Sequence, residues 1–200
     1  RGLGDVYKRQ IITFAIPLFF GLILIEFFYG VITKQNNYRI NDAITSMSLG
    51  LISRFVPILG LGFQYVVYKA VAEHYNLKLL SGEEIWVWVT AFILYDICYY
   101  WMHRIHHEIK VFWATHVVHH HGEEFNLATA LRQTSTGFLW KWVFFLPLFI
   151  IGIPPQMYVT VAGLNLVYQF WVHTEHIGRL GFLEYIFAVS YTHLRAHETV

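Results

Sequence analysis

The sequence predicts an all-α, multi-pass helical integral membrane protein with a histidine cluster on its cytoplasmic face. Hydrophobic residues make up 56% of the chain, more than the apolar share of soluble domains. Several stretches approach or exceed the length of about 20 apolar residues that crosses a bilayer core. Seven of the twelve histidines fall between residues 103 and 124, directly after one such stretch.

Three long apolar stretches are predicted as helices. Residues 11–32 are long enough, at about 1.5 Å per residue, to cross a core of about 30 Å. Residues 43–71 form the second stretch, which we expect Asn41 and Asp42 to cap. Its own proline and glycines should kink it, the alternative being that it begins as an interfacial helix. Residues 84–108 form the third, which is apolar at first and ends in histidines.

Two shorter stretches, residues 138–153 and 157–172, are predicted to form a helical hairpin because consecutive prolines separate them. Counting crossings from the third helix places its histidine end on the same side as His173. The loops on that side hold most of the basic residues, so the positive-inside rule predicts a cytoplasmic site, which we place in a bacterial inner membrane. The basic residues counted are Lys34, Arg39, Arg104, Lys110, Arg132 and Arg179.

Both ends of the chain look foreign to this fold. Residues 1–10, RGLGDVYKRQ, match the translation of a transposon-end sequencing adapter, and residues 189–200 contain the translation of its reverse complement. We therefore assign one membrane domain to residues 11–188 and expect it to be an incomplete piece of a longer protein. His193 and His197 lie in the second end segment and are rejected as site residues.

The charge balance predicts no nucleic-acid partner. The formal net charge is +1, and the two end segments supply four basic and two acidic residues, so the remainder is slightly acidic. No basic cluster is left that would bind nucleic acid or an anionic surface. The single cysteine, Cys98, excludes an intrachain disulfide framework.

The histidine spacing fits one face of a helix. At about 100° per residue, His103 and His107 share a stripe, and Asp96 lies on it two turns earlier. We expect Asp96 to orient a metal-bound histidine, the alternative being a hydrogen bond that packs two helices. A second group follows nine residues later and, if helical, also shares a face: His116, His119 and His120.

A metal site is the favoured interpretation of these groups, although a histidine run can also be a solvated turn. Desolvated imidazoles below an apolar span need partners, and a metal ion supplies them. Imidazole binds zinc, copper, iron and nickel, so ligand type does not name the metal. Five or more ligands exceed a four-coordinate structural zinc and favour two ions. The sequence lacks the H-E-x-x-H pattern of zinc proteases.

Two segments carry a resemblance to a known family. Residues 96–108, DICYYWMHRIHHE, and residues 113–120, WATHVVHH, resemble the H-x3-H and H-x2-H-H boxes of the fatty acid hydroxylase and sterol desaturase superfamily. Further likeness covers residues 123–133, 153–155, 165–175 and 180–187. The longer pattern is most similar to the alkylglycerol monooxygenase branch of this superfamily and its bacterial relatives.

The resemblance implies a di-iron, oxygen-dependent lipid monooxygenase. Molecular oxygen would be inserted into a lipid C–H bond next to an ether oxygen, with tetrahydrobiopterin as the electron donor of that branch; the donor for this chain stays open. The implied metal ligands are His103, His107, His116, His119, His120 and His173, supported by Asp96, Glu124 and Arg132. His106 and His176 rank lower as ligands, and His121 is taken as a bystander.

Two departures from the family pattern limit the inference. His121-Gly122-Glu123 stands where the family continues Ser-Ser-Glu, and a last box of the form H-R-V-H-H is missing. We therefore expect this chain alone to be inactive. The rival functions are sterol desaturation and fatty acyl hydroxylation within the superfamily. A membrane metal transporter is a more distant alternative, because its ligands would lie nearer the bilayer midplane.

Overall fold

The structure is a computed structural model that describes residues 3–80, 82, 84–177 and 181–182, with the backbone alone for residues 3–14, 54 and 56–62. All regular elements within these residues are helices, which confirms the all-α class. Residues 189–200, with His193 and His197, lie outside the described part, as does Arg179.

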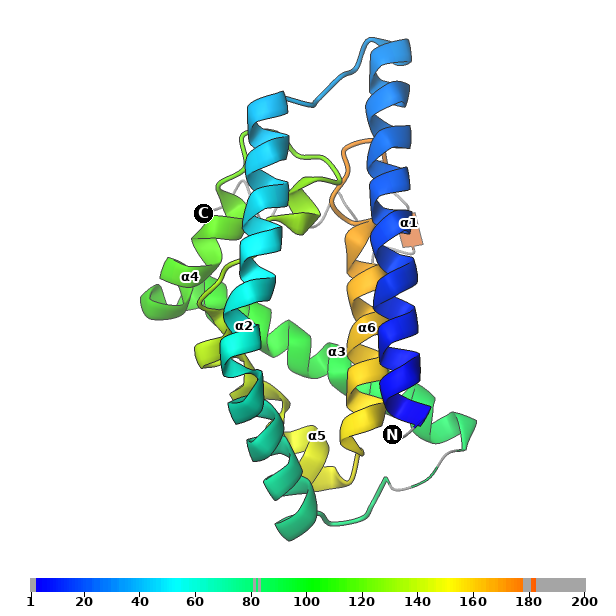
Figure 1. The fold of residues 1–200 in the computed structure, drawn as a ribbon, viewed down its shortest axis with the longest axis vertical. Helices are drawn as coiled ribbons and strands as arrows, with labels where there is room; N and C mark the ends of the chain where they lie inside the picture. The colour runs from blue at the N-terminus through cyan, green and yellow to red at the C-terminus, as the bar shows by residue number, and fades with distance from the viewer. Residues whose placement is uncertain (1–2, 81, 83, 178–180, 183–200) are drawn as a thin grey trace.

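Four helices set the frame of the molecule. α1 (Leu3–Thr33) and α2 (Ile40–His74) run in opposite directions along its long axis, joined by a short loop (Figure 1). α3 (Ile85–Glu108) crosses them obliquely, and α6 (Pro155–Phe170) packs along both α1 and α3. The three long stretches predicted as helices are therefore helical.

The second stretch forms one helix without a break, although it contains a proline and glycines. Its predicted caps are wrong, because the N-cap position is Arg39, which makes no capping hydrogen bond through its side chain. Asn41 and Asp42 lie inside the first turn. Asp42 instead pairs with a residue of a distant loop, Arg132.

The first limb of the predicted hairpin is broken into short pieces and does not form one continuous helix. It consists of two 3-10 turns, η2 (Gly137–Leu139) and η3 (Lys141–Phe145), followed by the short helix α5 (Leu146–Ile151). Pro147 explains why the helix starts afresh, since proline lacks the N–H that would continue an earlier helix but fits a first turn.

A tight turn then joins α5 to α6. Gly152 has a φ of 125°, which L side chains rarely adopt. A Cβ added there would lie 3.1 Å from the Asn76 side-chain oxygen, so the loop after α2 packs against this turn. Pro155 opens α6 at its first turn, where its missing N–H costs nothing.

Two buried clusters hold the helices together. The larger joins α2, α3, α5 and α6 and contains two stacked ring pairs, Tyr68 with Phe149 (4.3 Å between centroids) and Tyr95 with Phe145 (4.8 Å). The smaller joins α1 to α6 and to the loop around Leu127, with Phe19 stacked on Phe170 at 4.1 Å. Such pairs add about 0.5–1.5 kcal/mol beyond the area they bury.

Within the part of the chain that the structure describes, two helices are long and apolar enough to cross a membrane, namely the Ala15–Thr33 part of α1 and Ile85–Glu108 of α3. Only 28% and 22% of their apolar windows, respectively, are buried inside the molecule. Their large hydrophobic side chains, such as Ile25, Phe28 and Ile93, therefore point outward. A core helix of a soluble protein would bury this face, so the outward apolar surface suits a lipid environment.

Candidate metal centre

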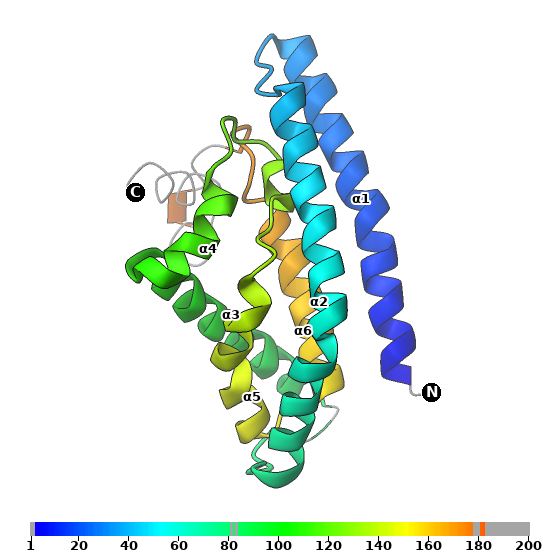
Figure 2. The same ribbon diagram turned by 60° about the vertical axis from the view of Figure 1, so that its left-hand side comes forward.

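A single extended residue brings the two histidine groups together. α3 ends and α4 (Lys110–His120) begins at Ile109, whose φ and ψ are −107° and 120°. The chain turns sharply there, so that α4 leaves at an angle to α3 and contacts it (Figure 2). The histidine face of each helix is thereby turned towards the other.

Four histidines form a tight cluster, which we call the quartet: His103, His107, His116 and His120. Their ligand nitrogens all lie within 4.8 Å of one another. The Nε2 atoms of His103 and His107 are 3.1 Å apart, and those of His116 and His120 are 3.0 Å apart. Four imidazoles from two facing helices thus converge on one small volume.

Two further histidines form a second group beside the quartet, which we call the pair. The Nε2 atoms of His119 and His173 are 3.1 Å apart, although 54 residues separate them in sequence. The Nδ1 of His119 contacts the Arg132 carbonyl at 2.8 Å, and the Nδ1 of His173 contacts the Gln169 carbonyl at 2.9 Å. A carbonyl only accepts, so each Nδ1 carries the proton and each Nε2 keeps its lone pair.

The pair and the quartet are neighbours in space. The His119 ring centroid lies 5.6 Å from that of His116 and 5.4 Å from that of His120. His119 and His116 project from one helix towards the two different groups. The arrangement therefore offers two adjacent sets of nitrogen ligands.

Burial keeps two of these imidazoles, those of His116 and His119, in the neutral form that binds metals. Desolvation lowers the pKa of His119 to about 4. Burial and then the neighbouring histidines His103 and His119 lower the pKa of His116 far below its ordinary value. Both rings are neutral at pH 7, so neither must lose a proton before it coordinates an ion.

The donor set fits one ion at the quartet and a second at the pair. Ligands about 2 Å from a shared ion lie about 3–4 Å from one another, and the nitrogen separations within both groups fall near that range. The Nε2 lone pairs of His119 and His173 face each other across 3.1 Å. A cation that both nitrogens coordinate would stabilise this arrangement. The pair alone leaves coordination positions for additional ligands.

Three further histidines, His106, His176 and His121, have other surroundings. The Nδ1 of His106 contacts the Met102 carbonyl at 2.6 Å, and its Nε2 has no hydrogen-bond partner among the described residues. His106 is only 1% exposed and, with His116, lines a small cavity of about 30 Å³. His176 packs edge-on against Tyr29 of α1. His121 is exposed.

Asp96 is hydrogen-bonded to the neighbouring helix α6. Its Oδ1 accepts a bond from the Asn165 amide at 3.0 Å, and Asn165 is buried. This contact joins α3 to α6, the helix that carries the chain to His173. The predicted role of Asp96 in orienting a metal-bound histidine stays a prediction.

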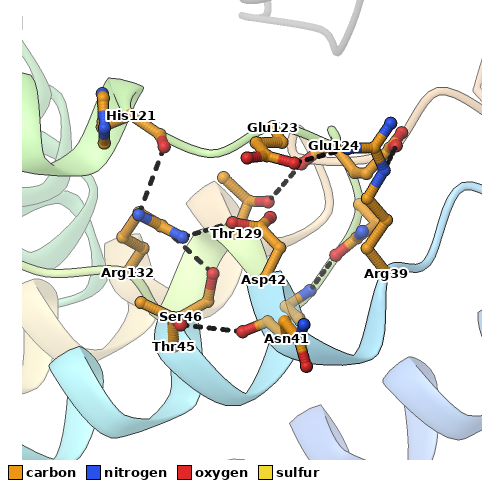
Figure 3. Close-up of polar contacts among 12 residues, drawn as sticks. Arg39, Asn41, Asp42, Thr45, Ser46, His121, Glu123, Glu124, Thr129 and Arg132 are labelled. Atoms are coloured by element: carbon orange, nitrogen blue, oxygen red, sulfur yellow. Dashed lines mark hydrogen bonds and ion pairs between the residues drawn. The ribbon is translucent and has the colours of Figure 1, made fainter.

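Arg132 connects the pair to α2 through a buried ion pair (Figure 3). Its guanidinium donates to Asp42 at 2.5 Å, to the Ser46 hydroxyl at 3.1 Å and to the His121 carbonyl at 3.3 Å. Arg132 is 4% exposed. It therefore does not give its loop the exposed positive charge that the positive-inside count assumes. Because its own carbonyl holds His119, α2 indirectly fixes that ring.

A wide groove of about 790 Å³ lies beside this ion pair. Arg39 stands on its rim and pairs with Glu123 and, at 2.7 Å, with Glu124 (Figure 3). His120 of the quartet also lines the groove, so one ligand helix borders a solvent-accessible space. Glu124 therefore pairs with Arg39, a residue that lines the groove.

Sequence reasoning missed Asp42, Ser46 and Asn165. The sequence predicts a capping role for Asp42, because an acidic residue at the start of a helix is favourable. Nothing in the sequence indicates that a loop 90 residues away would return to it. Asn165 lies inside an otherwise apolar helix, and a buried amide there needs a partner, which is the signal that could have identified it.

Comparison with known proteins agrees with this geometry. The family model for fatty acid hydroxylases matches residues 88–200, more than half of the chain, including every histidine of the quartet and the pair. The chain belongs to the fatty acid hydroxylase family. The match runs through residues 189–200, so the predicted adapter origin of that segment and the 11–188 boundary stay predictions.

The curated relatives of this chain include alkylglycerol monooxygenases. The chain is 40% identical to those of Homo sapiens and Danio rerio over 184 residues, and 29% identical to that of Caenorhabditis elegans over 173 residues. The alignments cover 92%, 92% and 86% of the chain, but 41%, 41% and 34% of those proteins. The chain thus spans less than half of their length. No solved structure matches it significantly.

Proposed function

We propose that the complete protein carrying this chain is a di-iron, oxygen-dependent monooxygenase that hydroxylates a lipid at the carbon next to an ether oxygen. The observation that carries the proposal is the division of six converging histidines into a quartet and an adjacent pair. The names of the relatives supply the ether-lipid substrate class.

The proposed reaction consumes one oxygen molecule and two electrons. One oxygen atom enters the C–H bond, and the other leaves as water with two protons and the two electrons of a reductant. The hydroxylated carbon then carries both a hydroxyl and an ether oxygen, and such a hemiacetal separates into an aldehyde and an alcohol. Two irons would supply the oxygen chemistry, and tetrahydrobiopterin is the proposed reductant.

The residues of this chain would hold and shield that chemistry. The quartet would bind one iron and the pair would contribute to the second, with the remaining ligands coming from other parts of the protein. Asp96, Glu124 and Arg132 would support them through helix packing and loop contacts. The outward apolar faces of α1 and α3 would give a membrane lipid direct access, and the site would face the cytoplasm of a bacterial inner membrane.

The test uses membranes that contain the complete gene product. They are incubated with an alkylglycerol, reduced tetrahydrobiopterin and oxygen, and the aldehyde is measured. The proposal expects oxygen-dependent aldehyde release that is lost in His107→Ala and kept in His121→Ala. Oxidation of a sterol or an acyl chain without ether cleavage would favour the rival reactions of the family instead.

A further inference from the structure

Glu26 is a buried carboxylate in the middle of an apolar stretch of α1. It is 5% exposed and lies between Ile25 and Phe27. An ionisable side chain at such a position is costly to bury unless hydrogen bonds satisfy it. Glu26 also lies well outside residues 88–200, the part that matches the family model, and no sequence motif surrounds it.

Three donors from three separate loops converge on this carboxylate. One oxygen accepts from the Tyr38 hydroxyl and from the Leu127 backbone N–H, the latter at 2.8 Å. The other oxygen accepts from the Thr174 hydroxyl. Ionised carboxylates only accept, and their two oxygens can take several donors at once. Glu26 therefore fastens three loops to one point on α1.

Two of these loops position the pair: one contains His173, and the other leads to the carbonyl that holds the ring of His119, which itself projects from α4. Thr174 directly follows His173 in the chain. Leu127 lies in the segment that runs from the end of α4 to Arg132, whose carbonyl fixes the Nδ1 of His119. Figure 1 shows the loop after α6 and the loop before η1 (Thr129–Leu131) meeting beside the upper half of α1.

The loop between α1 and α2 strengthens the same junction. The Asn37 amide donates to the Phe125 carbonyl at 3.2 Å and to the Glu175 carboxylate at 3.1 Å. The Asn126 amide returns a bond to the Asn37 carbonyl at 2.8 Å. Phe125 in turn stacks on the His173 ring at 5.9 Å. The junction around Glu26 thus extends to the face of a proposed ligand.

The quartet has a support of its own besides this junction. Its four members project from α3 and α4, which pack directly on each other and are joined by one residue. His173 instead lies just beyond the end of α6, in a loop. A change at Glu26 should therefore disturb the pair before it disturbs the quartet.

We propose that Glu26 is a positioning residue of the metal centre: it holds the loops after α4 and α6 so that His119 and His173 face each other. This inference rests on the proposed function in that the pair is taken to bind metal. It makes the first helix part of the centre, although its sequence contains no histidine.

Glu26→Gln is the main test variant, because it keeps the shape of the side chain and replaces one acceptor oxygen with a donor. Thr174→Val is the second, since it removes only a hydroxyl and leaves α1 intact. Glu73→Gln is the matched control, because Glu73 is an exposed residue of α2 paired with Lys69 at 3.7 Å. A loss of folding in Glu26→Gln would leave Thr174→Val to decide.

The first measurement is histidine modification by diethylpyrocarbonate, mapped by mass spectrometry on the detergent-solubilised chain. His119 and His173 are buried and should be protected in the parent chain. We expect their modification to rise several-fold in both test variants, while His103 and His116 keep their parent rates. Unchanged modification of the pair would overturn the inference, as would an equal rise at all four rings, which would indicate general loosening.

The second measurement is titration with Co²⁺ alone, followed by its visible absorption. Groups that orient metal ligands typically alter affinity by about 10–100-fold, so the weaker class of Co²⁺ sites should lose about tenfold in the test variants while the stronger class is unchanged. A parent chain that binds no Co²⁺ would contradict the proposed metal site. The modification experiment would still decide whether Glu26 positions the pair.

Discussion

Removing the Asp42 carboxylate should destabilise the protein far more than breaking any surface ion pair. Asp42 and Arg132 have side chains that are only 9% and 5% exposed, and their contact measures 2.5 Å. In Asp42→Ala the guanidinium stays buried without its counter-charge. Removing one partner of a buried ion pair costs about 3–5 kcal/mol, and we expect a loss of unfolding free energy in this range.

The assay is equilibrium unfolding of the chain in detergent, monitored by circular dichroism. Glu108→Ala is the control, because Glu108 forms an exposed ion pair with Arg104. The Glu108 side chain is 58% exposed and that of Arg104 is 48% exposed. Such a pair on one helix contributes about 0.3–0.5 kcal/mol. The two variants should therefore differ several-fold in their effect.

A double variant separates the ion pair from simple side-chain loss. Replacing both buried charges with apolar groups is often neutral, so Asp42→Leu with Arg132→Met should be more stable than Asp42→Ala alone. Equal losses of unfolding free energy in Asp42→Ala and Glu108→Ala would refute the reasoning. It would also be refuted if the loss in the double variant equalled the sum of the losses in Asp42→Leu and Arg132→Met alone. We also expect Asp42→Ala to weaken Co²⁺ binding, because Arg132 holds His119.

Three further predictions concern the centre and the fold. The double variant His103→Ala, His120→Ala should weaken Co²⁺ binding by more than about 100-fold, since lost ligands cost more than lost orienting groups, whereas His121→Ala should leave a titration curve unchanged. The metal-free chain should keep its full unfolding free energy above pH 6.5 and lose part of it as the pH falls towards 4. The reason is that burial lowers the pKa of His119 from 6.5 to about 4. Between these two pH values the unfolded chain binds a proton that the folded chain does not. A stability that is flat or rises from pH 6.5 to 4.5 would show that the ring is not buried in the neutral form. Gly152→Ala should lower the unfolding free energy by about 1–3 kcal/mol because its φ of 125° strains any L side chain, without a change in Co²⁺ affinity; an unaffected melting temperature would contradict the backbone geometry.

Local periodicity is the part of this molecule that its sequence predicts well. The helix spacing of His103 and His107, and of His116 and His120, is enough to place each set on one face. The helical class follows equally from apolar stretches of sufficient length. Both kinds of inference depend only on residues a few positions apart.

Long-range contacts are the part that sequence reasoning missed. Asp42 meets Arg132 across 90 residues, and Glu26 meets Thr174 across 148. Each of these acidic residues also has a plausible local role, a helix cap for Asp42 and an interfacial charge for Glu26. The local pattern therefore does not indicate the distant partner. The break in the first limb of the hairpin was missed for a different reason. The apolar run around Pro147 is continuous and favours a single helix, whereas the helix begins again at this proline.

The proposal that the quartet and the pair belong to a centre with two irons is tested most directly by the metal content of the complete protein. The protein is purified from iron-supplemented cells and analysed by plasma mass spectrometry together with Mössbauer spectroscopy. We expect two irons for each chain and a spectrum of two coupled, nitrogen-rich sites, with about one iron lost in His173→Ala. A single stoichiometric zinc, or a metal-free protein that still cleaves ether lipids, would contradict the proposal.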